Sequence, residues 1–469
     1  MTLSCSGRAG SGTKFPTSLK LAAGQFRGSR RLQVESLINA RWVIPVEPER
    51  QVCEFHSIAI EGGRIHAILP TSEAREQFSA QRTVDLPRHA LIPGLVNAHT
   101  HVAMSLFRGL ADDLPLMDWL QHHIWPAEQR WVHEEFVADG TRLAIAEMLR
   151  GGTTCFNDMY FFPDVTGQVA ASIGMRAVIG LILIDFPSAW AEDANGYLHR
   201  AIEVHDRFRN EPLVTTAFAP HAPYSVSDEP LARMLVLDNE LELPIHMHVH
   251  ETRQEIEQSL SQHGVRPLAR LQRLGLLGPS LVAVHMTQLT DEEIEMVAQA
   301  GAQIVHCPES NLKLASGMCR AADLMDAGAN VAIGTDGAAS NNDLDMLGES
   351  RTAALLGKGI AGDPSALPAH RVLRMATLNG ARALGLDRQT GSLVPGKAAD
   401  IVAIDLGQPT TQPVYDPVSQ IVYAAGREQV SDVWIAGRRL VSNSRVNCLD
   451  VPELVRNAQR WGERIAAHH

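Results

Sequence analysis

The chain has 469 residues, of which 45% are hydrophobic and 20% are charged, so it can form one large globular domain and a smaller one. Its net charge of −12 argues against a nucleic-acid partner, and its longest apolar run, residues 177–184, is far shorter than the ~18 residues that a membrane span needs. Six scattered cysteines without a Cys-x-x-Cys pair indicate no disulfide framework and a reducing, cytoplasmic setting.

The first 31 residues differ in composition from the rest of the chain. They contain six Lys and Arg residues, no acidic residue and many Gly and Ser. They also lack the continuous apolar core of a secretory signal. We therefore expect residues 1–31 to be a disordered leader that takes no part in the fold, with a transit-like segment or a misplaced start as the alternatives.

Both ends of the remaining chain are rich in β-forming residues and Gly-containing turns. Residues 57–65 predict a hairpin with a Gly-Gly turn, and residues 391–402 have a similar pattern near the C-terminus. We therefore expect a small β-sandwich domain formed by both chain ends, residues 32–92 and 385–443. A C-terminal helix is expected over residues 444–469.

The long middle of the chain, residues 93–384, alternates apolar strand-like runs with helical patterns. Eight runs are predicted to be strands: 93–101, 154–159, 176–184, 213–219, 243–248, 281–286, 303–307 and 331–335. Helical patterns such as residues 136–150 and 291–300 lie between them. Repeated strand-then-helix units predict a parallel sheet, and eight of them predict an α/β protein with a closed (β/α)8 barrel.

The first of these runs, Pro93-Gly94-Leu95-Val96-Asn97-Ala98-His99-Thr100-His101, ends in two histidines one residue apart. On a strand such residues face the same side, so both imidazoles can point at one position in space. A bare His-x-His pair fits a metal site about as well as it fits one core histidine and one exposed histidine. The remaining strands have to decide between these two interpretations.

Residues that can bind a metal also occur at the ends of other predicted strands. They are His221 after the fourth strand, His246, His248 and His250 at the fifth, His285 at the sixth, and Asp336 at the eighth. In a (β/α)8 barrel the carboxyl ends of the strands meet at one face, where the chemistry takes place. Histidines scattered through the core by chance would not gather at the carboxyl ends of successive strands. The pattern therefore predicts a metal centre at that face of the barrel.

Taken together, the motifs resemble those of the amidohydrolase superfamily, and within it the chlorohydrolase and deaminase branch that includes the 5′-methylthioadenosine/S-adenosylhomocysteine deaminases. The resemblance spans nearly the whole chain beyond residue 31 and implies a metal-dependent hydrolase barrel. It rests on the run that ends at His101, and on His246-Met247-His248-Val249-His250-Glu251-Thr252, Val284-His285, Ser310-Asn311-Leu312-Lys313-Leu314 and Gly334-Thr335-Asp336-Gly337-Ala338-Ala339-Ser340-Asn341-Asn342.

The resemblance implies one divalent metal, with zinc as the first choice and iron as the alternative, and a water that completes its coordination. The implied ligands are His99, His101, His248 and Asp336. Many amidohydrolases bridge two metals with a carboxylated lysine, but this chain has no lysine between Lys20 and Lys313. A carboxylate or cysteine bridge remains open, and a single metal is the simpler interpretation.

The resemblance also implies a hydrolytic mechanism, in which the metal makes its water more acidic. Asp336 accepts a proton from that water, and Glu251 protonates the ring nitrogen beside the attacked carbon. His285 orients the water and stabilises developing charge. A carboxylate such as Glu251 at the start of a helix also suits the helix dipole, but its spacing from His248 favours the catalytic interpretation.

Several residues are predicted to contact the substrate, Glu251 among them. A lid-like segment resembles the ribose-binding region of nucleoside deaminases, in which Glu128 accepts the ribose hydroxyls and Trp119 lines an apolar pocket. Without the resemblance, a solvated carboxylate and a packed indole describe these two residues better. His221 resembles the substrate-contacting histidine of the family, and Ser340 is expected to reach the pocket.

The family pattern implies that relatives using S-adenosylhomocysteine place arginines just past the strand that begins at Arg176, where they pair with the amino-acid carboxylate. In this chain Leu181 and an apolar, aromatic loop around Phe186 occupy that region. Burying a carboxylate without a cation is unfavourable, so the sequence favours the thioether nucleoside. Arg150, Arg176 or a partner subunit remain alternative sources of a cation.

We therefore expect the chain to deaminate 5′-methylthioadenosine, S-adenosylhomocysteine or adenosine, with release of ammonia and the hypoxanthine nucleoside. Two alternatives remain: a guanine deaminase, triazine deaminase or chlorohydrolase on the same scaffold, and a catalytically inactive interaction protein. The complete ligand set and Glu251 argue against an inactive protein. The expected partner is a small-molecule nucleoside, with no nucleic acid and no membrane, and family habit implies a homo-oligomer.

Overall fold

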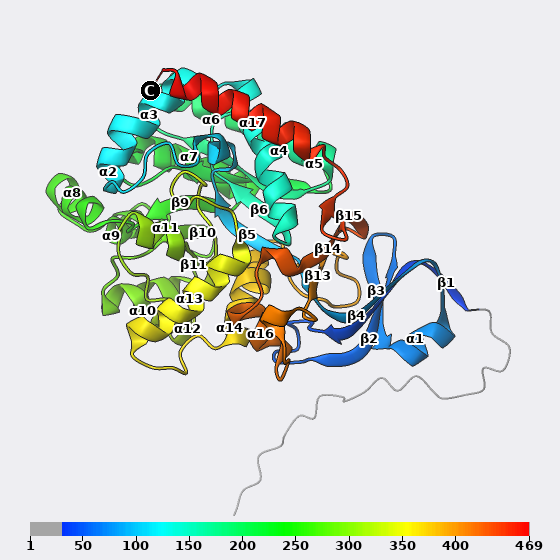
Figure 1. Ribbon diagram of the computed structural model, residues 1–469. Helices are drawn as coiled ribbons and strands as arrows, with labels where there is room; N and C mark the ends of the chain where they lie inside the picture. The colour runs from blue at the N-terminus through cyan, green and yellow to red at the C-terminus, as the bar shows by residue number, and fades with distance from the viewer. Residues whose placement is uncertain (1–30, 469) are drawn as a thin grey trace, which may run out of the picture.

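The structure is a computed structural model that describes residues 31–468, so the predicted leader lies outside the described residues except for Arg31. Two eight-stranded sheets organise the described chain. Figure 1 shows one sheet inside a ring of helices on the left, and the strands contributed by the two chain ends toward the lower right.

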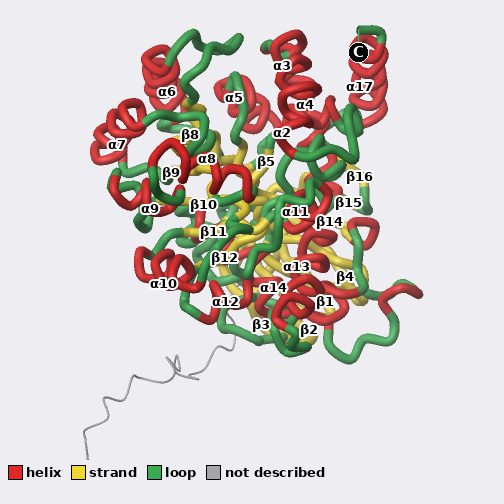
Figure 2. Tube along the Cα trace, turned by 90° about the vertical axis from the view of Figure 1, so that its left-hand side faces the viewer, coloured by secondary structure: helices red, strands yellow, loops and turns green. Residues whose placement is uncertain are grey.

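The first sheet is parallel and runs in the order β12-β11-β10-β9-β8-β7-β6-β5. Its strands are β5 (Leu95–Thr100), β6 (Thr153–Asp158), β7 (Arg176–Leu183), β8 (Val214–Pro220), β9 (Ile245–Val249), β10 (Leu281–His285), β11 (Gln303–His306) and β12 (Asn330–Ile333). The helices that follow them include α5 (Pro163–Ile173), α6 (Ala194–Phe208), α7 (Asp228–Leu241), α8 (Arg253–His263), α9 (Pro267–Arg273), α10 (Asp291–Ala300), α11 (Pro308–Lys313), α12 (Ala321–Asp326), α13 (Met346–Ala361) and α14 (Ala369–Arg374). Figure 2 shows these strands enclosed by helices, and the predicted (β/α)8 barrel is confirmed.

The barrel closes between its first and last strands, β5 and β12, through side-chain and loop contacts. The Asn97 amide donates to Thr335 Oγ1 at 2.7 Å, and the Thr335 backbone N–H donates to Asn97 Oδ1 at 3.0 Å. The backbone N–H of Asp336 donates to His99 O at 3.1 Å. Gly334 permits this approach, because a Cβ there would lie 2.8 Å from the backbone N of His99. This junction between β5 and β12, the seam of the barrel, therefore places Asp336 beside His99.

The barrel strands are buried on both faces, as expected for a parallel sheet covered by helices. Every residue of β5, β6, β7, β9 and β10 is buried. Polar residues within these strands, such as Asn97, Asn157 and His246, are at most 1% exposed. Buried polar groups need hydrogen-bond partners, and here Asn157 lies against His246 while Asn97 pairs with Thr335.

The second sheet is continuous and contains strands from both ends of the chain, in the order β16-β15-β14-β13-β4-β1-β2-β3. Its strands are β1 (Leu32–Val43), β2 (Cys53–Glu61), β3 (Arg64–Pro70), β4 (Phe78–Pro93), β13 (Ile401–Asp405), β14 (Val430–Ile435), β15 (Arg438–Ser442) and β16 (Arg445–Val446). Short helices α1 (Thr71–Gln77) and α16 (Pro417–Tyr423) accompany them. Antiparallel pairing of β4 with β13 joins the two chain ends, and Gly94 alone separates β4 from the first barrel strand.

The C-terminal helix, α17 (Val451–Ala466), begins later than residue 444 because β16 precedes it. Asp450 caps it by accepting the Glu453 backbone N–H at 3.0 Å. The helix packs against α4 (Glu134–Arg150), where Trp461 Nε1 donates to Asp139 Oδ2 at 3.0 Å. Figures 1 and 2 both show α17 beside α3 (Trp125–Trp131) as well.

A cap of short helices lies over the carboxyl ends of the strands. It consists of a 3-10 turn η1 (Val102–Phe107), α2 (Leu116–Trp119), a π-helical turn η2 (Leu120–Ile124) and α3. The ring of Trp131 in α3 meets the ring of Trp461 in α17 edge to face, with centroids 6.4 Å apart. The C-terminal helix therefore supports the cap from outside.

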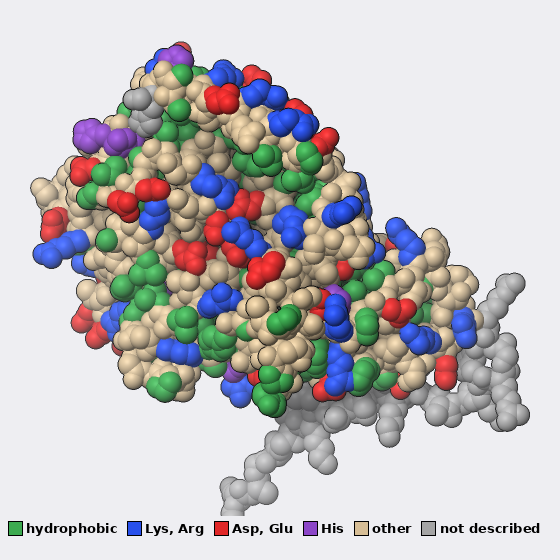
Figure 3. Space-filling model, in the orientation of Figure 1, with side chains coloured by type: hydrophobic (Ala, Val, Ile, Leu, Met, Phe, Trp, Pro, Cys, Tyr) green, Lys and Arg blue, Asp and Glu red, His purple; other side chains and the backbone are tan. Residues whose placement is uncertain are grey.

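The exposed surface carries both signs of charge. On the face shown in Figure 3, Lys and Arg side chains are interspersed with Asp and Glu, and apolar side chains form small groups. Such a face lacks the single-sign field that steers a protein onto a nucleic-acid backbone. No helix among residues 31–468 is both long and apolar enough to cross a membrane.

A buried ion pair between Arg176 and Asp400 joins the barrel to the terminal sheet. Arg176 begins β7, and its Nε and Nη2 donate to Asp400 at 2.8 and 3.2 Å. Asp400 also accepts from Thr390 Oγ1 at 2.8 Å and from the Ala436 backbone N–H at 2.7 Å. The two charged side chains are only 5% and 0% exposed, so each depends on the other for compensation of its charge.

Replacing Asp400 by Ala should lower the free energy of unfolding by about 3–5 kcal/mol, because Arg176 would stay buried without its partner. Urea denaturation measures the change. The control is Glu257→Ala on α8, which breaks an exposed pair with Arg253 and should change stability by less than about 0.5 kcal/mol. Similar small losses for both variants would contradict the assignment.

Candidate active site

Left-handed backbone conformations occur at the carboxyl ends of three barrel strands. His250 follows β9, His285 ends β10 and Asp336 comes shortly after β12, with φ angles of 55°, 75° and 62°. Such conformations are unfavourable for residues other than glycine, by of order 1–3 kcal/mol each. Strain of this kind concentrates at functional sites, and here it occurs at three strand ends that face one region.

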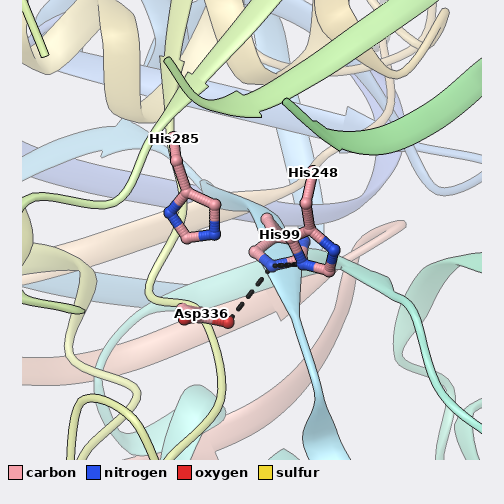
Figure 4. Close-up of side chains that lie close together, drawn as sticks. All are labelled: His99, His248, His285 and Asp336. Carbon is pink, nitrogen blue, oxygen red and sulfur yellow. Dashed lines mark hydrogen bonds and ion pairs between the residues drawn. The ribbon is translucent and has the colours of Figure 1, made fainter. Parts of the chain in front are cut away.

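Four side chains from different strands converge in that region, as Figure 4 shows. His99, His248, His285 and Asp336 offer ligand atoms that all lie within 4.8 Å of one another. His101 reaches the same group, because its Nε2 lies 3.2 Å from Asp336 Oδ1. The structure thus brings together the four predicted ligands and adds His285 to them.

Hydrogen bonds to backbone carbonyls orient two of the imidazoles. His101 donates from Nδ1 to Met159 O, and His248 donates from Nδ1 to His221 O at 2.8 Å. In a neutral imidazole the Nε2 atom then carries no proton and is able to bind a metal. His248 Nε2 lies 3.2 Å from His99 Nε2, in the middle of the cluster.

Two buried polar side chains support His99 from the barrel interior. His246 Nε2 lies 2.7 Å from His99 Nδ1, and the Asn157 side chain lies 2.7 Å from His246 Nδ1. On the other edge of its ring, His99 Nε2 lies 3.2 Å from Asp336 Oδ1. His246 therefore packs inside the barrel, and there it fixes the ring of a predicted metal ligand.

Asp336 is held by four side chains. Its Oδ1 lies 3.2 Å from Nε2 of both His99 and His101, while its Oδ2 accepts hydrogen bonds from Ser310 and Ser340 at 2.7 Å. Burial acts to raise the pKa of Asp336, but hydrogen bonds and charges of the two histidines hold the pKa well below its usual value. The carboxylate therefore stays ionised at neutral pH.

Burial lowers the pKa of several imidazoles at the site. The pKa of His99 falls to about 4, that of His221 falls to about 3, and that of His248 lies well below its usual value. For His101 burial also acts to lower the pKa, but the hydrogen bond to Asp336 outweighs it and raises the pKa to about 9. Ligand nitrogens must be unprotonated, so a metal would take the place of that proton. Imidazoles and an ionised carboxylate form a donor set that fits one zinc-like cation.

Glu251 and His285 face each other at the edge of the cluster. His285 Nδ1 donates to Asn311 Oδ1 at 2.9 Å, which leaves its Nε2 as the acceptor, 3.8 Å from Glu251 Oε1. Glu251 is 6% exposed, and burial raises the pKa of its carboxyl. A carboxyl with a raised pKa holds a proton closer to neutral pH and can donate it to a substrate.

A pocket of about 800 Å³ opens above the cluster, and every predicted site residue except His99 lines it. Trp119 and Glu128 belong to the wall that the cap contributes. The Glu128 residue is half-buried, and its carboxyl group faces the pocket. Desolvation there raises the pKa of this carboxyl to about 7, although the Tyr160 hydroxyl and the charge of His101 act to lower it. The group therefore changes charge near neutral pH.

The sequence pattern predicts no role for Ser310 and Asn311, although both stand in a motif that supports the family resemblance. In the structure Ser310 donates to Asp336 and Asn311 orients His285. Ser340, predicted to contact the substrate, also donates its hydroxyl to Asp336. The motif indicates that Ser310 and Asn311 belong to the site, but it does not show that they bind Asp336 and His285.

Comparisons with known proteins support the family resemblance. The profile of the Amidohydrolase family matches residues 90–440. The chain is 48% identical over 434 residues to a curated 5-methylthioadenosine/S-adenosylhomocysteine deaminase from Teredinibacter turnerae, which covers 92% of this chain and 98% of that protein. A protein of the same name from Saccharophagus degradans is 48% identical over 439 residues, or 94% of this chain and 98% of that protein.

Solved structures with a similar fold include an adenosine deaminase from Xanthomonas campestris with bound zinc. It is 55% identical, with a TM-score of 0.93, and the match covers 93% of this chain and 100% of that one. A zinc complex of atrazine chlorohydrolase from Arthrobacter aurescens is 25% identical, with a TM-score of 0.84 and coverages of 91% and 99%. Because the family profile and these relatives match most of its length, the chain belongs to the amidohydrolase family.

Proposed function

We propose that this chain is a metal-dependent deaminase of adenine nucleosides. It hydrolyses the exocyclic amine of 5′-methylthioadenosine, S-adenosylhomocysteine or adenosine and releases ammonia with the hypoxanthine nucleoside. The main structural support is the convergence of imidazoles and one ionised carboxylate below a buried Glu251 whose pKa is raised. The names of the curated relatives add support for the first two substrates.

His99, His101, His248 and Asp336 are the side chains that would hold one divalent cation. When bound, such a cation supplies the positive charge that brings the pKa of a coordinated water close to neutrality. The zinc in the Xanthomonas structure supports zinc as the native metal over iron. The Nδ1 atom of His285 is bound to Asn311, so its Nε2 atom is available to orient the reacting water.

Glu251 and Asp336 divide the proton transfers between them. Attack on a purine carbon is easier when the adjacent ring nitrogen is protonated, and Glu251 supplies this proton. Asp336 accepts one proton from the attacking water, because its carboxylate is ionised. Glu251 then takes the remaining hydroxyl proton, Asp336 passes its proton to the leaving amine, and ammonia departs with both carboxyl groups restored.

Three residues of the pocket wall recognise the nucleoside in this proposal. Glu128 accepts hydrogen bonds from the ribose hydroxyls, and Trp119 contributes an apolar surface. His221 Nδ1 lies 2.9 Å from Ser225 Oγ, so its Nε2 remains for the substrate. If Glu128 binds ribose hydroxyls, the pocket favours a nucleoside over a free base or a triazine, because neither of these carries a ribose.

A mainly apolar cleft adjoins the pocket and shares Trp125, Glu128, Phe161 and Phe186 with it. Among residues 31–468, no Lys or Arg lines either the pocket or this cleft. The amino-acid carboxylate of S-adenosylhomocysteine would lose water there without gaining a cation, whereas a methylthio group is apolar. We therefore propose 5′-methylthioadenosine as the preferred substrate.

Ammonia release from a panel of nucleosides and bases tests the reaction and the preference together. The value of kcat/KM for 5′-methylthioadenosine should exceed that for S-adenosylhomocysteine by about tenfold or more, because an unpaired buried charge costs at least about 1–3 kcal/mol. Adenosine, which lacks both 5′ groups, is the control. Equal or better use of S-adenosylhomocysteine would refute the preference. Activity on guanine or a triazine alone would instead support the alternative hydrolases.

Changing Glu128 to Gln should raise KM for the nucleoside about 10- to 100-fold, because a charged acceptor contributes about 1.5–3 kcal/mol to its hydrogen bonds. For the wild type, KM should fall as the pH rises through about 7, where Glu128 becomes ionised, and the variant should lose this trend. Steady-state kinetics below and above that pH measure both effects. Free adenine, which has no ribose, is the control, and an unchanged KM for the nucleoside would contradict ribose recognition by Glu128.

Replacing His246 by Phe should weaken zinc binding about 10- to 100-fold, because His99 would lose the partner that orients its ring. Competition with a chromogenic zinc chelator measures the dissociation constant. His89 is likewise buried but lies in β4 of the terminal sheet, so His89→Phe should leave zinc affinity unchanged. Equal affinities of the wild type and the His246 variant would rule out this role.

A further inference from the structure

The loop between β9 and α8 carries Glu251 and contains an unusual carboxylate contact. His250 turns this loop with a φ angle of 55°, Glu251 follows, and Thr252 caps α8 by accepting the Glu255 backbone N–H at 3.2 Å. Glu255 stands three residues after the cap, in the first turn of the helix. At this position a glutamate often accepts the backbone N–H of the cap residue.

Here the Glu255 carboxyl group reaches beyond Thr252, the N-cap residue of α8, and binds the backbone of the two residues before Thr252. Its Oε1 accepts the His250 backbone N–H at 3.0 Å, and its Oε2 accepts the Glu251 backbone N–H at 2.7 Å. The Glu255 residue is 4% exposed, so water does not compete for these bonds. Burial raises the pKa of Glu255 to about 8 against these two hydrogen bonds. Its two oxygens nevertheless accept from adjacent amides, which fixes the orientation of the peptide between them.

Thr287, in the loop after β10, holds the same segment from its carbonyl side. Its hydroxyl donates to Glu251 O at 2.6 Å, and its backbone N–H donates to His250 O at 2.9 Å. The main chain of His250 and Glu251 is therefore bound at its N–H groups by Glu255 and at its carbonyl groups by Thr287. The clamp therefore joins α8 and the loop after β10 to the loop that carries Glu251.

The Glu251 carboxyl itself has to exchange protons with the substrate, so strong side-chain hydrogen bonds cannot be used to immobilise it. It lies 3.8 Å from His285 Nε2, beyond hydrogen-bond distance. Its position must therefore come from the backbone that carries it. A displacement of about 1 Å in a reacting group can cost about 100-fold in rate.

We propose that Glu255 is a positioning residue, whose carboxylate clamps the backbone of His250 and Glu251 and so aims the Glu251 carboxyl at the substrate ring. Glu255 does not line the pocket and touches no reacting atom. The inference rests on the proposed function, in which Glu251 is the proton donor. It adds a residue on α8 to the residues that the reaction requires.

Glu255→Gln tests the clamp, because the new amide places an N–H₂ donor against a backbone N–H. We expect kcat for 5′-methylthioadenosine to fall about 10- to 100-fold, with KM changed less than about twofold and zinc content retained. Glu257→Gln is the matched control on the same helix, since Glu257 is exposed and pairs with Arg253. Unchanged kcat in Glu255→Gln, or an equal loss in the control, would overturn the proposal.

A double-mutant cycle separates positioning from a general loss of structure. If Glu255 acts through Glu251, then Glu251→Gln/Glu255→Gln should be no slower than Glu251→Gln alone. Additive losses would mean that Glu255 acts independently of Glu251. A Glu251→Gln enzyme with the kcat of the wild type would instead refute the proposed function, so the two failures can be told apart.

A second variant covers the case in which Glu255→Gln does not fold. Thr287→Val keeps the side-chain shape and removes the hydroxyl bond to Glu251 O. It should lower kcat with little change in KM, and its effect should also vanish in the Glu251→Gln background. A loss confined to KM would overturn the proposal.

Discussion

The hydrogen bond from the Asp336 backbone N–H to His99 O, across the seam of the barrel, is the contact on which the site depends. It joins the last barrel strand to the first, and the two residues are 237 positions apart in the chain. Once the seam is closed, Asp336 Oδ1 comes within 3.2 Å of both His99 and His101. Gly334 is required here because a side chain would hold the two strands apart. The metal centre is thus a consequence of barrel closure.

The two carboxyl groups of the site have opposite protonation tendencies because their neighbours differ. Asp336 lies against imidazoles and two hydroxyl donors, which together hold its pKa low in spite of burial. Glu251 lies 3.8 Å from His285 and has no comparable set of donors, so burial raises its pKa. One carboxyl can therefore act as a base and the other as an acid at the same pH. This division is set by surroundings, since the side chains are chemically alike.

Groups outside the pocket control the geometry within it. His246 and Asn157 orient His99 from inside the barrel, and Glu255 binds the backbone that precedes and includes Glu251. On the outside, the edge-to-face contact of Trp461 with the cap links the C-terminal helix to the pocket wall. Each of these contacts joins segments that are held in place by the barrel. Rigid support of this kind keeps reacting groups aligned without blocking them.

The sequence by itself predicted the barrel, because alternating apolar runs and helical patterns indicate a parallel sheet covered by helices, and eight such units suit a closed barrel. It also indicated the candidate ligands, since residues at the carboxyl ends of parallel strands must meet at one face. The tertiary structure alone decided which side chains bind one another. That His285 joins the ligand cluster, that Ser310 holds Asp336, and that Glu255 clamps Glu251 all depend on strand register, left-handed turns and side-chain rotamers. Register, turns and rotamers are set by packing between segments that lie far apart in the chain, so they cannot be predicted from a local sequence pattern.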